Sequence, residues 1–165
     1  MPWIIPVSYT HLASSAGVEI DLVIRGICSL RVGIPGVSEN IHVRSIVGNF
    51  LEHSRIFYFY NDGREEVYMG SADWMPRNLE RRVEIVFPVN DEDLKKEVIH
   101  ILQIQLKDNV KARILQPDDS YRRAERRGQK PLNSQEYFCE EAAARISTGE
   151  TAFTARRFVP RESEE

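Results

Sequence analysis

Hydrophobic and polar positions follow the clearest pattern between residues 56 and 70. Two runs of β-branched and aromatic residues, at 56–60 and 66–70, flank the dipeptide Asp62-Gly63, which is a strong turn signal. The pattern predicts a β-hairpin whose loop lies at about residues 61–64.

Two further patterns precede this hairpin. The apolar run at residues 19–24 predicts a strand buried on both faces, preceded by the last turn of a helix that closes on Gly17. Arg25 follows that strand and opens a loop rich in glycine and proline. Residues 44–53 carry apolar side chains at helical spacing, which predicts a helix that ends at His53, directly before the hairpin.

The chain after the hairpin continues to alternate between predicted helices and strands. The pattern predicts a short turn at residues 76–79 and strands over residues 83–87 and 109–115. It predicts helices over residues 91–108, where acidic residues occupy the first turn, and over residues 133–146. Strands that alternate with helices predict an α/β domain.

Composition narrows the class of protein. A length of 165 residues with 42% hydrophobic and 28% charged residues is typical of one globular domain. The net charge of −3 argues against a general nucleic-acid binder, and the basic stretch at residues 121–130 is interpreted as a solvated loop. No apolar run approaches the roughly 18 residues of a membrane span. Cys28 and Cys139 lack metal-ligand spacing. We therefore expect a cytoplasmic protein with no transmembrane segment and no metal ligands of its own.

The two ends of the chain are expected to lie outside the domain. Residues 1–12 have neither the basic start nor the long apolar core of a signal peptide, and they resemble in part a translated adaptor sequence. We expect residues 1–12 to be a non-native leader, residues 13–145 to form the domain, and residues 146–165 to be a flexible tail.

Polar side chains gather at the open end of the predicted hairpin. Pairing across the loop brings His53 and Arg55 close to residues 70–73, so we expect Ser71 or Asp73 within hydrogen-bonding reach of the His53 neighbourhood. Ligands of open α/β sheets bind beyond the carboxyl ends of strands, where Arg25 lies. We therefore expect Arg25 and His53 to approach each other at a common open cleft.

A histidine among arginines suits phosphoryl chemistry. Imidazole can attack phosphorus or transfer a proton near neutral pH. Guanidinium groups bind the oxygens of a phosphoryl group bidentately and stabilise the charge that develops there. A His-Arg pair at a strand end is common, so this pattern alone does not identify a function.

Longer strings carry a resemblance to known families. The string "HSR…GSADWMPRN" resembles a degraded phospholipase D signature, with Arg55 in place of the lysine and Asp73 where an asparagine is expected. The strings "DLVIRGICSLRVGIPGVSENIHVRSIVGNFLEHSRIFYF" and "VYMGSADWMPRNLERRVEIVFPV" strongly resemble the carboxyl-terminal domain of bacterial polyphosphate kinases of the phosphohistidine type. This second resemblance covers roughly residues 13–145.

The resemblance implies a phospholipase D-like domain with a mixed β-sheet flanked by helices. It implies reversible transfer of the terminal phosphate of ATP to inorganic polyphosphate. Arg25 and His53 are implied to contact the ATP phosphates, with His53 also assisting proton transfer, and Arg82 is implied to line the polyphosphate channel. Arg55, Ser71 and Asp73 are supporting candidates at the site.

The resemblance also implies groups that no segment of this chain matches. The nucleophilic histidine belongs to another phospholipase D-like domain, and amino-terminal domains hold the nucleotide base. Mg²⁺ is implied as a cofactor with ligands outside this chain, and the full-length enzyme is implied to be a homo-oligomer. ATP, ADP and polyphosphate are the implied partners, with no nucleic acid. We therefore expect a fragment that is inactive on its own.

Two other function classes stay open. A phospholipase D-type phosphodiesterase or nuclease uses paired His-Lys motifs, whereas this chain has one motif with its lysine substituted. Such an enzyme would cleave a phosphodiester reporter. A non-catalytic polyanion-binding module would use the basic stretch and the loop arginines, and its binding would be sensitive to salt without a nucleotide preference.

Overall fold

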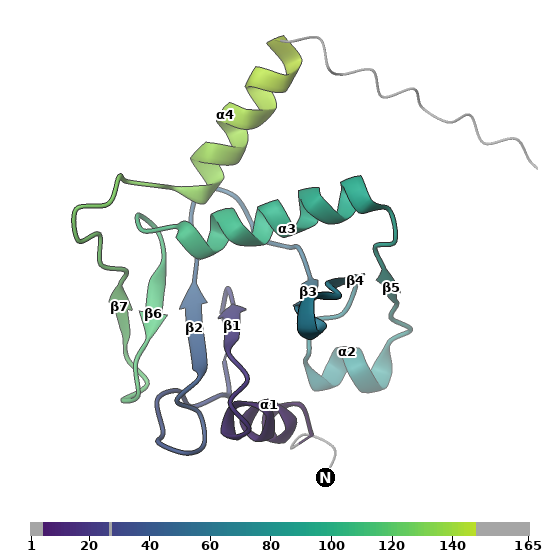
Figure 1. Ribbon diagram of the computed structural model, residues 1–165, viewed down its shortest axis with the longest axis vertical. Coiled ribbons are helices and arrows are strands. Elements are labelled where there is room, and N and C mark those ends of the chain that lie inside the picture. Colours follow the sequence, from purple (N-terminus) through teal and green to yellow (C-terminus); the bar gives the residue numbers. More distant parts are fainter. Residues whose placement is uncertain (1–4, 27, 148–165) are drawn as a thin grey trace, which may run out of the picture. The chain divides into compact units, whose positions relative to one another are not determined.

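The chain folds into helices and strands in a computed structural model that describes residues 5–26 and 28–147 (Figure 1). The elements are α1 (Ile5–Ser15), β1 (Ile20–Val23), β2 (Ile41–Ser45), β3 (Ile56–Phe59), a 3-10 turn (Asn61–Gly63), β4 (Glu66–Gly70), α2 (Pro76–Arg81), β5 (Val86–Pro88), α3 (Glu92–Lys107), β6 (Arg113–Leu115), β7 (Tyr121–Arg123) and α4 (Ser134–Ser147). The predicted α/β class is confirmed. The chain divides into one unit that ends at Gln135 and a second that starts at Glu136, within α4.

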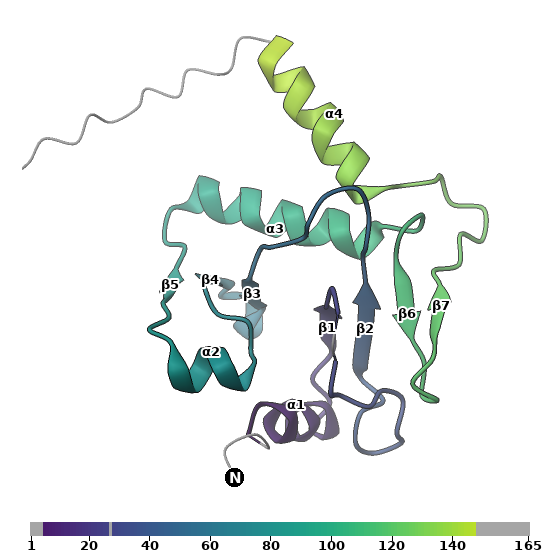
Figure 2. The ribbon, with the colours of Figure 1, turned by 180° about the vertical axis from the view of Figure 1, so that it is seen from behind.

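Four strands form a mixed sheet in the order β1-β2-β6-β7. β1 and β2 are parallel, and their arrows point the same way in Figures 1 and 2, whereas the other two pairs are antiparallel. In β2, Ile41 and Val43 are buried and alternate with more exposed polar residues, as expected for a strand with one face on the core. Because β1 and β2 are parallel, the chain leaves both strands at the same edge of the sheet.

The hydrophobic core lies against this mixed sheet. Its buried members and the half-buried residues packed on them are Val32, Ile41, Val43 and Leu115, with Ile20, Leu22, Ile24 and Cys28. The predicted strand at residues 19–24 is confirmed as β1, but the prediction that both its faces are buried is wrong. Asp21 is exposed and the other residues of β1 are half-buried, because β1 is an edge strand with one neighbour.

The predicted hairpin is confirmed. β3 and β4 pair antiparallel with Ile56 opposite Met69, and β5 adds a third strand to this second sheet. The turn between the strands is built from residues with positive φ, at 45° for Asn61, 53° for Asp62 and 81° for Gly63. Asn, Asp and Gly are the residue types that tolerate this left-handed conformation, which explains the strength of the local signal.

The predicted helix over residues 44–53 is wrong. The chain is in β2 up to Ser45 and then irregular, and Val47, Phe50 and Leu51 are exposed. Arg44 and Ser45 pair with β6 on one side, while Arg44 also lies beside Val23 of β1. Strand pairing therefore accounts for residues 44 and 45, and the rest of the predicted helix is irregular.

The other predicted helices are confirmed. The helix predicted to close on Gly17 is α1, the helix at residues 91–108 is α3, and the helix at residues 133–146 is α4. Asp91 caps α3 by accepting hydrogen bonds of 3.0 Å from the backbone N–H groups of Asp93 and Leu94. Among the described residues, no helix has the length and apolar character needed to cross a membrane.

Several predicted segments differ in type or extent. The turn at residues 76–79 is part of the helix α2, and the strand expected at residues 83–87 is β5, which begins only at residue 86. The strand at 109–115 shortens to β6. The solvated loop expected at 121–130 begins with β7, which pairs with β6, so that part of the prediction is wrong.

The expected ends of the domain remain predictions. The residues expected to form a leader include the start of α1, which runs from Ile5. Of the expected tail, residues 148–165 lie outside the described part of the chain.

Candidate functional site

The parallel pairing of β1 and β2 places Arg25 beside the segment that carries His53. The ladder continues past β1, since Ile24 N donates to the Arg44 carbonyl at 2.8 Å. Ser45 Oγ then donates to the carbonyl of Arg25 at 3.1 Å. The Arg25 guanidinium Nη1 donates to the Glu52 carbonyl at 2.6 Å, directly before His53. Arg25 and the His53 segment therefore approach each other as predicted, while their common open cleft stays a prediction.

His53, Arg55 and Asp73 form one hydrogen-bonded group. Arg55 Nε donates to Asp73 Oδ1 at 3.0 Å, and Arg55 Nη1 lies 3.1 Å from both Nδ1 and the carbonyl oxygen of His53. The hairpin register produces this group, because Gly70 N donates to the carbonyl of Arg55 at 3.1 Å and so carries residue 73 toward residue 53. The predicted reach of Asp73 to the His53 neighbourhood is confirmed.

Asp73 lies in a strongly positive environment. The hydrogen bond from Arg55 holds the pKa of the Asp73 carboxyl below its ordinary value, against the opposing effect of partial burial. The charges of Arg55, Arg25 and Arg77 lower the pKa of Asp73 further. Asp73 is therefore an anion at neutral pH. Arg77 of α2 is not among the predicted site residues, although it lies within the string "GSADWMPRN" that carries the resemblance.

Ser71 and Arg82 belong to a different group, centred on Glu84. Ser71 Oγ donates to Glu84 Oε2 and accepts from the backbone N–H of Ile85 at 3.1 Å. Arg82 Nη1 lies 3.9 Å from Glu84 Oε1, and its side chain is 65% exposed. Ser71 therefore bonds to residues 84 and 85. Of the two candidates, Asp73 is the one that joins the His53 group.

Two buried glutamines hold the segment that leads to His53. Gln135 accepts from Phe50 N at 3.1 Å and donates to the Phe50 carbonyl at 2.8 Å and to Glu52 Oε1 at 2.6 Å. Gln105 of α3 donates to Glu52 Oε2 at 3.1 Å. A side chain at Gly48 would collide with Gln135, which explains the glycine there. These contacts fix the segment of residues 50–52, whose Glu52 carbonyl accepts the hydrogen bond from Arg25 directly before His53.

The glutamine contacts could not be found from the sequence. Gln105 and Gln135 lie 53 and 83 residues from Glu52 and carry no local motif.

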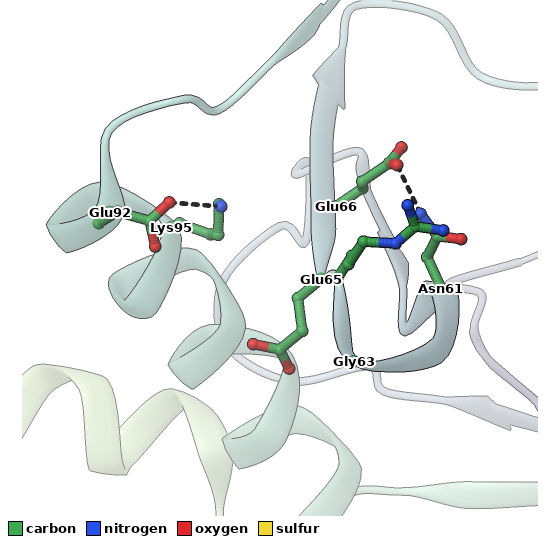
Figure 3. Close-up of a pocket in the computed structure, with 7 residues that line it drawn as sticks. Asn61, Gly63, Glu65, Glu66, Glu92 and Lys95 are labelled. Atoms are coloured by element: carbon green, nitrogen blue, oxygen red, sulfur yellow. Dashed lines mark hydrogen bonds and ion pairs between the residues drawn. The ribbon is translucent and has the colours of Figure 1, made fainter.

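A separate hollow of about 470 Å³ lies between the hairpin turn and the start of α3 (Figure 3). It is lined by Asn61, Gly63, Arg64, Glu65, Glu66, Glu92 and Lys95. Its charges are partly satisfied internally, since Lys95 pairs with Glu92 at 2.7 Å and Asn61 donates to Glu66 at 2.7 Å. With three carboxylates against two cations, this hollow does not suit a phosphate, and none of the predicted site residues lines it.

Comparison with known proteins identifies the family of this chain. A family model described as "Polyphosphate kinase C-terminal domain 2" matches residues 6–135. The polyphosphate kinase of Pseudomonas aeruginosa is 56% identical over 139 residues, which are 84% of this chain and 20% of that protein. The polyphosphate kinase of Synechocystis sp. is 59% identical over 125 residues, which are 76% of this chain and 17% of that protein. The chain thus spans about a fifth of the length of the curated relatives it matches.

A solved structure shows the same fold. The crystal structure of polyphosphate kinase from Porphyromonas gingivalis matches with a TM-score of 0.81 and 43% identity, covering 87% of this chain and 22% of that one. The predicted phospholipase D-like fold and the resemblance stated from the sequence are therefore confirmed. By the family match and these relatives, the chain belongs to the polyphosphate kinase C-terminal domain 2 family.

Proposed function

We propose that this chain forms one wall of the phosphate-binding site of a polyphosphate kinase, which transfers the terminal phosphate of ATP reversibly to inorganic polyphosphate. Arg25 and His53 contact the phosphates of ATP, and Arg82 contacts the polyphosphate chain. The observation that carries the proposal is the placing of an exposed arginine against the His53 segment, in a domain of this family.

The chemistry of the group supports this role. Arg25 is exposed and donates one N–H to Glu52, and the same fork of N–H groups can bind phosphoryl oxygens bidentately. A fixed guanidinium stabilises the negative charge that develops on those oxygens during phosphoryl transfer. The Glu52 contact holds this guanidinium next to the residue that precedes His53, and in the proposed site the imidazole and the arginine act on one phosphate.

The cofactor and the assembly of the whole enzyme are further proposals. Mg²⁺ belongs to the proposed reaction, but the described residues do not fit a Mg²⁺ site. They contain no group of three or more potential metal-ligating residues, and Asp73, the carboxylate of the His53 group, is bonded to Arg55. We therefore assign no Mg²⁺ ligand here. A cytoplasmic location, where ATP is supplied, and a homo-oligomeric whole enzyme stay proposals.

Binding of tripolyphosphate to the purified 165-residue chain tests the proposed site directly. We expect weak binding that falls roughly tenfold between about 50 and about 200 mM salt, as for two exposed arginine–phosphate contacts. Arg25→Met should weaken binding about tenfold, because a hydrogen bond to a charged group is worth roughly 1.5 kcal/mol or more. Calorimetric titration measures both effects.

Arg31→Met is the matched control for that titration. Arg31 is also an exposed loop arginine, but it pairs with Asp119 at 4.0 Å. Equal losses in the two variants would show that net charge alone attracts the anion, and the proposed site would be wrong.

Arg82→Ala tests the proposed polyphosphate channel. The Arg82 side chain is 65% exposed and has one long ion pair, so its loss should leave the fold intact. We expect weaker binding of long polyphosphate chains and little change for ATP. The measurement compares the two affinities in the same variant. Equal losses for both ligands would indicate that Arg82 does not distinguish the chain from the nucleotide.

A further inference from the structure

The contact between Arg55 and His53 has a fixed hydrogen-bond direction. A guanidinium group has only N–H donors and no acceptor, and it stays protonated in proteins. Because Arg55 Nη1 lies 3.1 Å from His53 Nδ1, this ring nitrogen accepts the hydrogen bond. A neutral imidazole that accepts at Nδ1 carries its hydrogen on Nε2.

The guanidinium of Arg55 is held in this position by two other bonds. Its Nε donates to Asp73 Oδ1 at 3.0 Å, and its Nη1 also donates to the carbonyl of His53 at 3.1 Å. The side chain of Arg55 is only 20% exposed. Turning Arg55 away from the ring would break both bonds.

The order of the three groups decides the tautomer. A carboxylate in contact with Nδ1 would accept a hydrogen from the ring and leave Nε2 as the acceptor. Here the carboxylate of Asp73 contacts Arg55, and Arg55 contacts the ring. The guanidinium between them therefore makes Nδ1 the acceptor, whereas direct contact with a carboxylate would make Nδ1 the donor.

We propose that Arg55 and Asp73 are positioning residues that hold His53 as the tautomer with its hydrogen on Nε2. His53 then presents an N–H donor to a phosphoryl oxygen, while its lone pair at Nδ1 is covered by Arg55. The assignment of a phosphoryl oxygen as the acceptor rests on the proposed function, whereas the assignment of the tautomer does not. His53 in this state stabilises charge on the transferred phosphate and has no free lone pair with which to attack phosphorus.

The tautomer can be measured in the 165-residue chain labelled with ¹⁵N-histidine. Long-range ¹H–¹⁵N correlation distinguishes the two neutral tautomers at about pH 8.5, which lies above the ordinary range of histidine pKa values. The chain has four histidines, and the signals missing in His53→Ala assign this ring. We expect His53 almost entirely in the Nε2–H form. A substantial Nδ1–H population in the unmodified chain would overturn the proposal.

Variants of Arg55 test its control over the ring. Arg55→Met removes the donor and should raise the Nδ1–H fraction of His53, whereas Arg55→Lys retains a donor and should keep the Nε2–H form. Arg31→Met should change nothing, and unchanged signals of the other three histidines show an intact fold. An unchanged tautomer in Arg55→Met would exclude the positioning role. If that variant does not fold, Asp73→Asn, which weakens the hold on Arg55, gives the same test.

Tripolyphosphate separates this inference from the proposed function. Added to the labelled chain, it should shift the Nε2 signal of His53 more than the Nδ1 signal. An Nε2–H ring that does not respond to tripolyphosphate would leave the tautomer standing and contradict the proposed phosphate contact. A response centred on Nδ1 would overturn the inference itself.

Discussion

His53→Ala is expected to reduce polyphosphate synthesis at least about 100-fold in an enzyme that carries this domain. A positioned acid, base or hydrogen-bond donor at the reacting group contributes roughly 10²–10⁴-fold to the rate. His53 is exposed, so its truncation removes little packing and the fold should be unchanged. The loss should therefore appear in turnover and not in thermal stability.

A chimera allows this measurement. Residues 6–135 replace the matching segment of the Pseudomonas aeruginosa polyphosphate kinase, and incorporation of labelled phosphate from ATP into polymer gives the rate. The control is His42→Ala, because His42 is an exposed histidine of β2 whose Nε2 lies 3.4 Å from Glu19. Normal turnover by His53→Ala would remove this residue from the mechanism.

His53→Gln distinguishes two roles for the imidazole. The glutamine amide places an N–H donor close to the position of Nε2 but cannot transfer a proton. If His53 acts as a hydrogen-bond donor, this variant should recover part of the activity lost in His53→Ala. Equal activities of the two variants would instead favour proton transfer by His53.

Local signals explain why much of the site was predictable. The hairpin turn, the β-branched runs and the strand before Arg25 are encoded by neighbouring residues. The hairpin register then fixes which residues meet, so the pairing of residues 53 and 55 with the segment that ends at Asp73 follows from a count along the chain. The hydrogen bond between Arg55 and Asp73 is the contact that this register produces.

Long-range contacts explain what was missed. The last two residues of β2, Arg44 and Ser45, are predicted as the start of a helix, but β1 and β6, which are distant in sequence, pair with this segment. Ser71 was grouped with His53 because both lie at the open end of the hairpin, whereas β5 brings Glu84 to it. Gln135 completes the site from the start of α4 and has no motif. No local pattern reports which distant partner a strand or a buried amide will have.

Asp108→Ala is expected to lower the free energy of unfolding by roughly 4 kcal/mol, since several hydrogen bonds to a buried charged acceptor are lost together. Asp108 is 1% exposed and follows α3. Its Oδ1 accepts from the backbone N–H groups of Val110, Lys111 and Ala112 at 3.0, 2.8 and 3.1 Å. Its Oδ2 accepts from the N–H and the hydroxyl of Ser134, both at 2.8 Å.

The same contacts predict how stability depends on pH. Burial alone raises the pKa of Asp108, but the hydrogen bonds from Ser134, Lys111 and Ala112 outweigh it and hold that pKa below its ordinary value. A carboxyl with a depressed folded-state pKa stabilises the fold above the unfolded value of about 3.9. This stabilisation is lost as the pH falls through the folded-state pKa. Unfolding of the chain should therefore become easier below about pH 4.

Denaturant unfolding at several pH values measures both effects. Asp108→Asn should flatten the acid part of the stability curve, and Asp118→Ala is the control. Asp118 likewise accepts from a backbone N–H and a hydroxyl, both of Ser120, but it is exposed, so its loss should be small. Equal losses for Asp108→Ala and Asp118→Ala would contradict the role of burial.

The Asp108 contacts also support the segment that leads to His53 in the proposed site. Asp108 joins the end of α3 to Ser134, and the glutamines that hold the His53 segment lie three residues before Asp108 and one residue after Ser134. Asp108→Ala should therefore free the Glu52 carboxylate from one or both amides before the domain unfolds. In conditions where the variant is still folded, we expect weaker tripolyphosphate binding than in the unmodified chain. Unchanged binding would show that the glutamine contacts persist without this carboxylate.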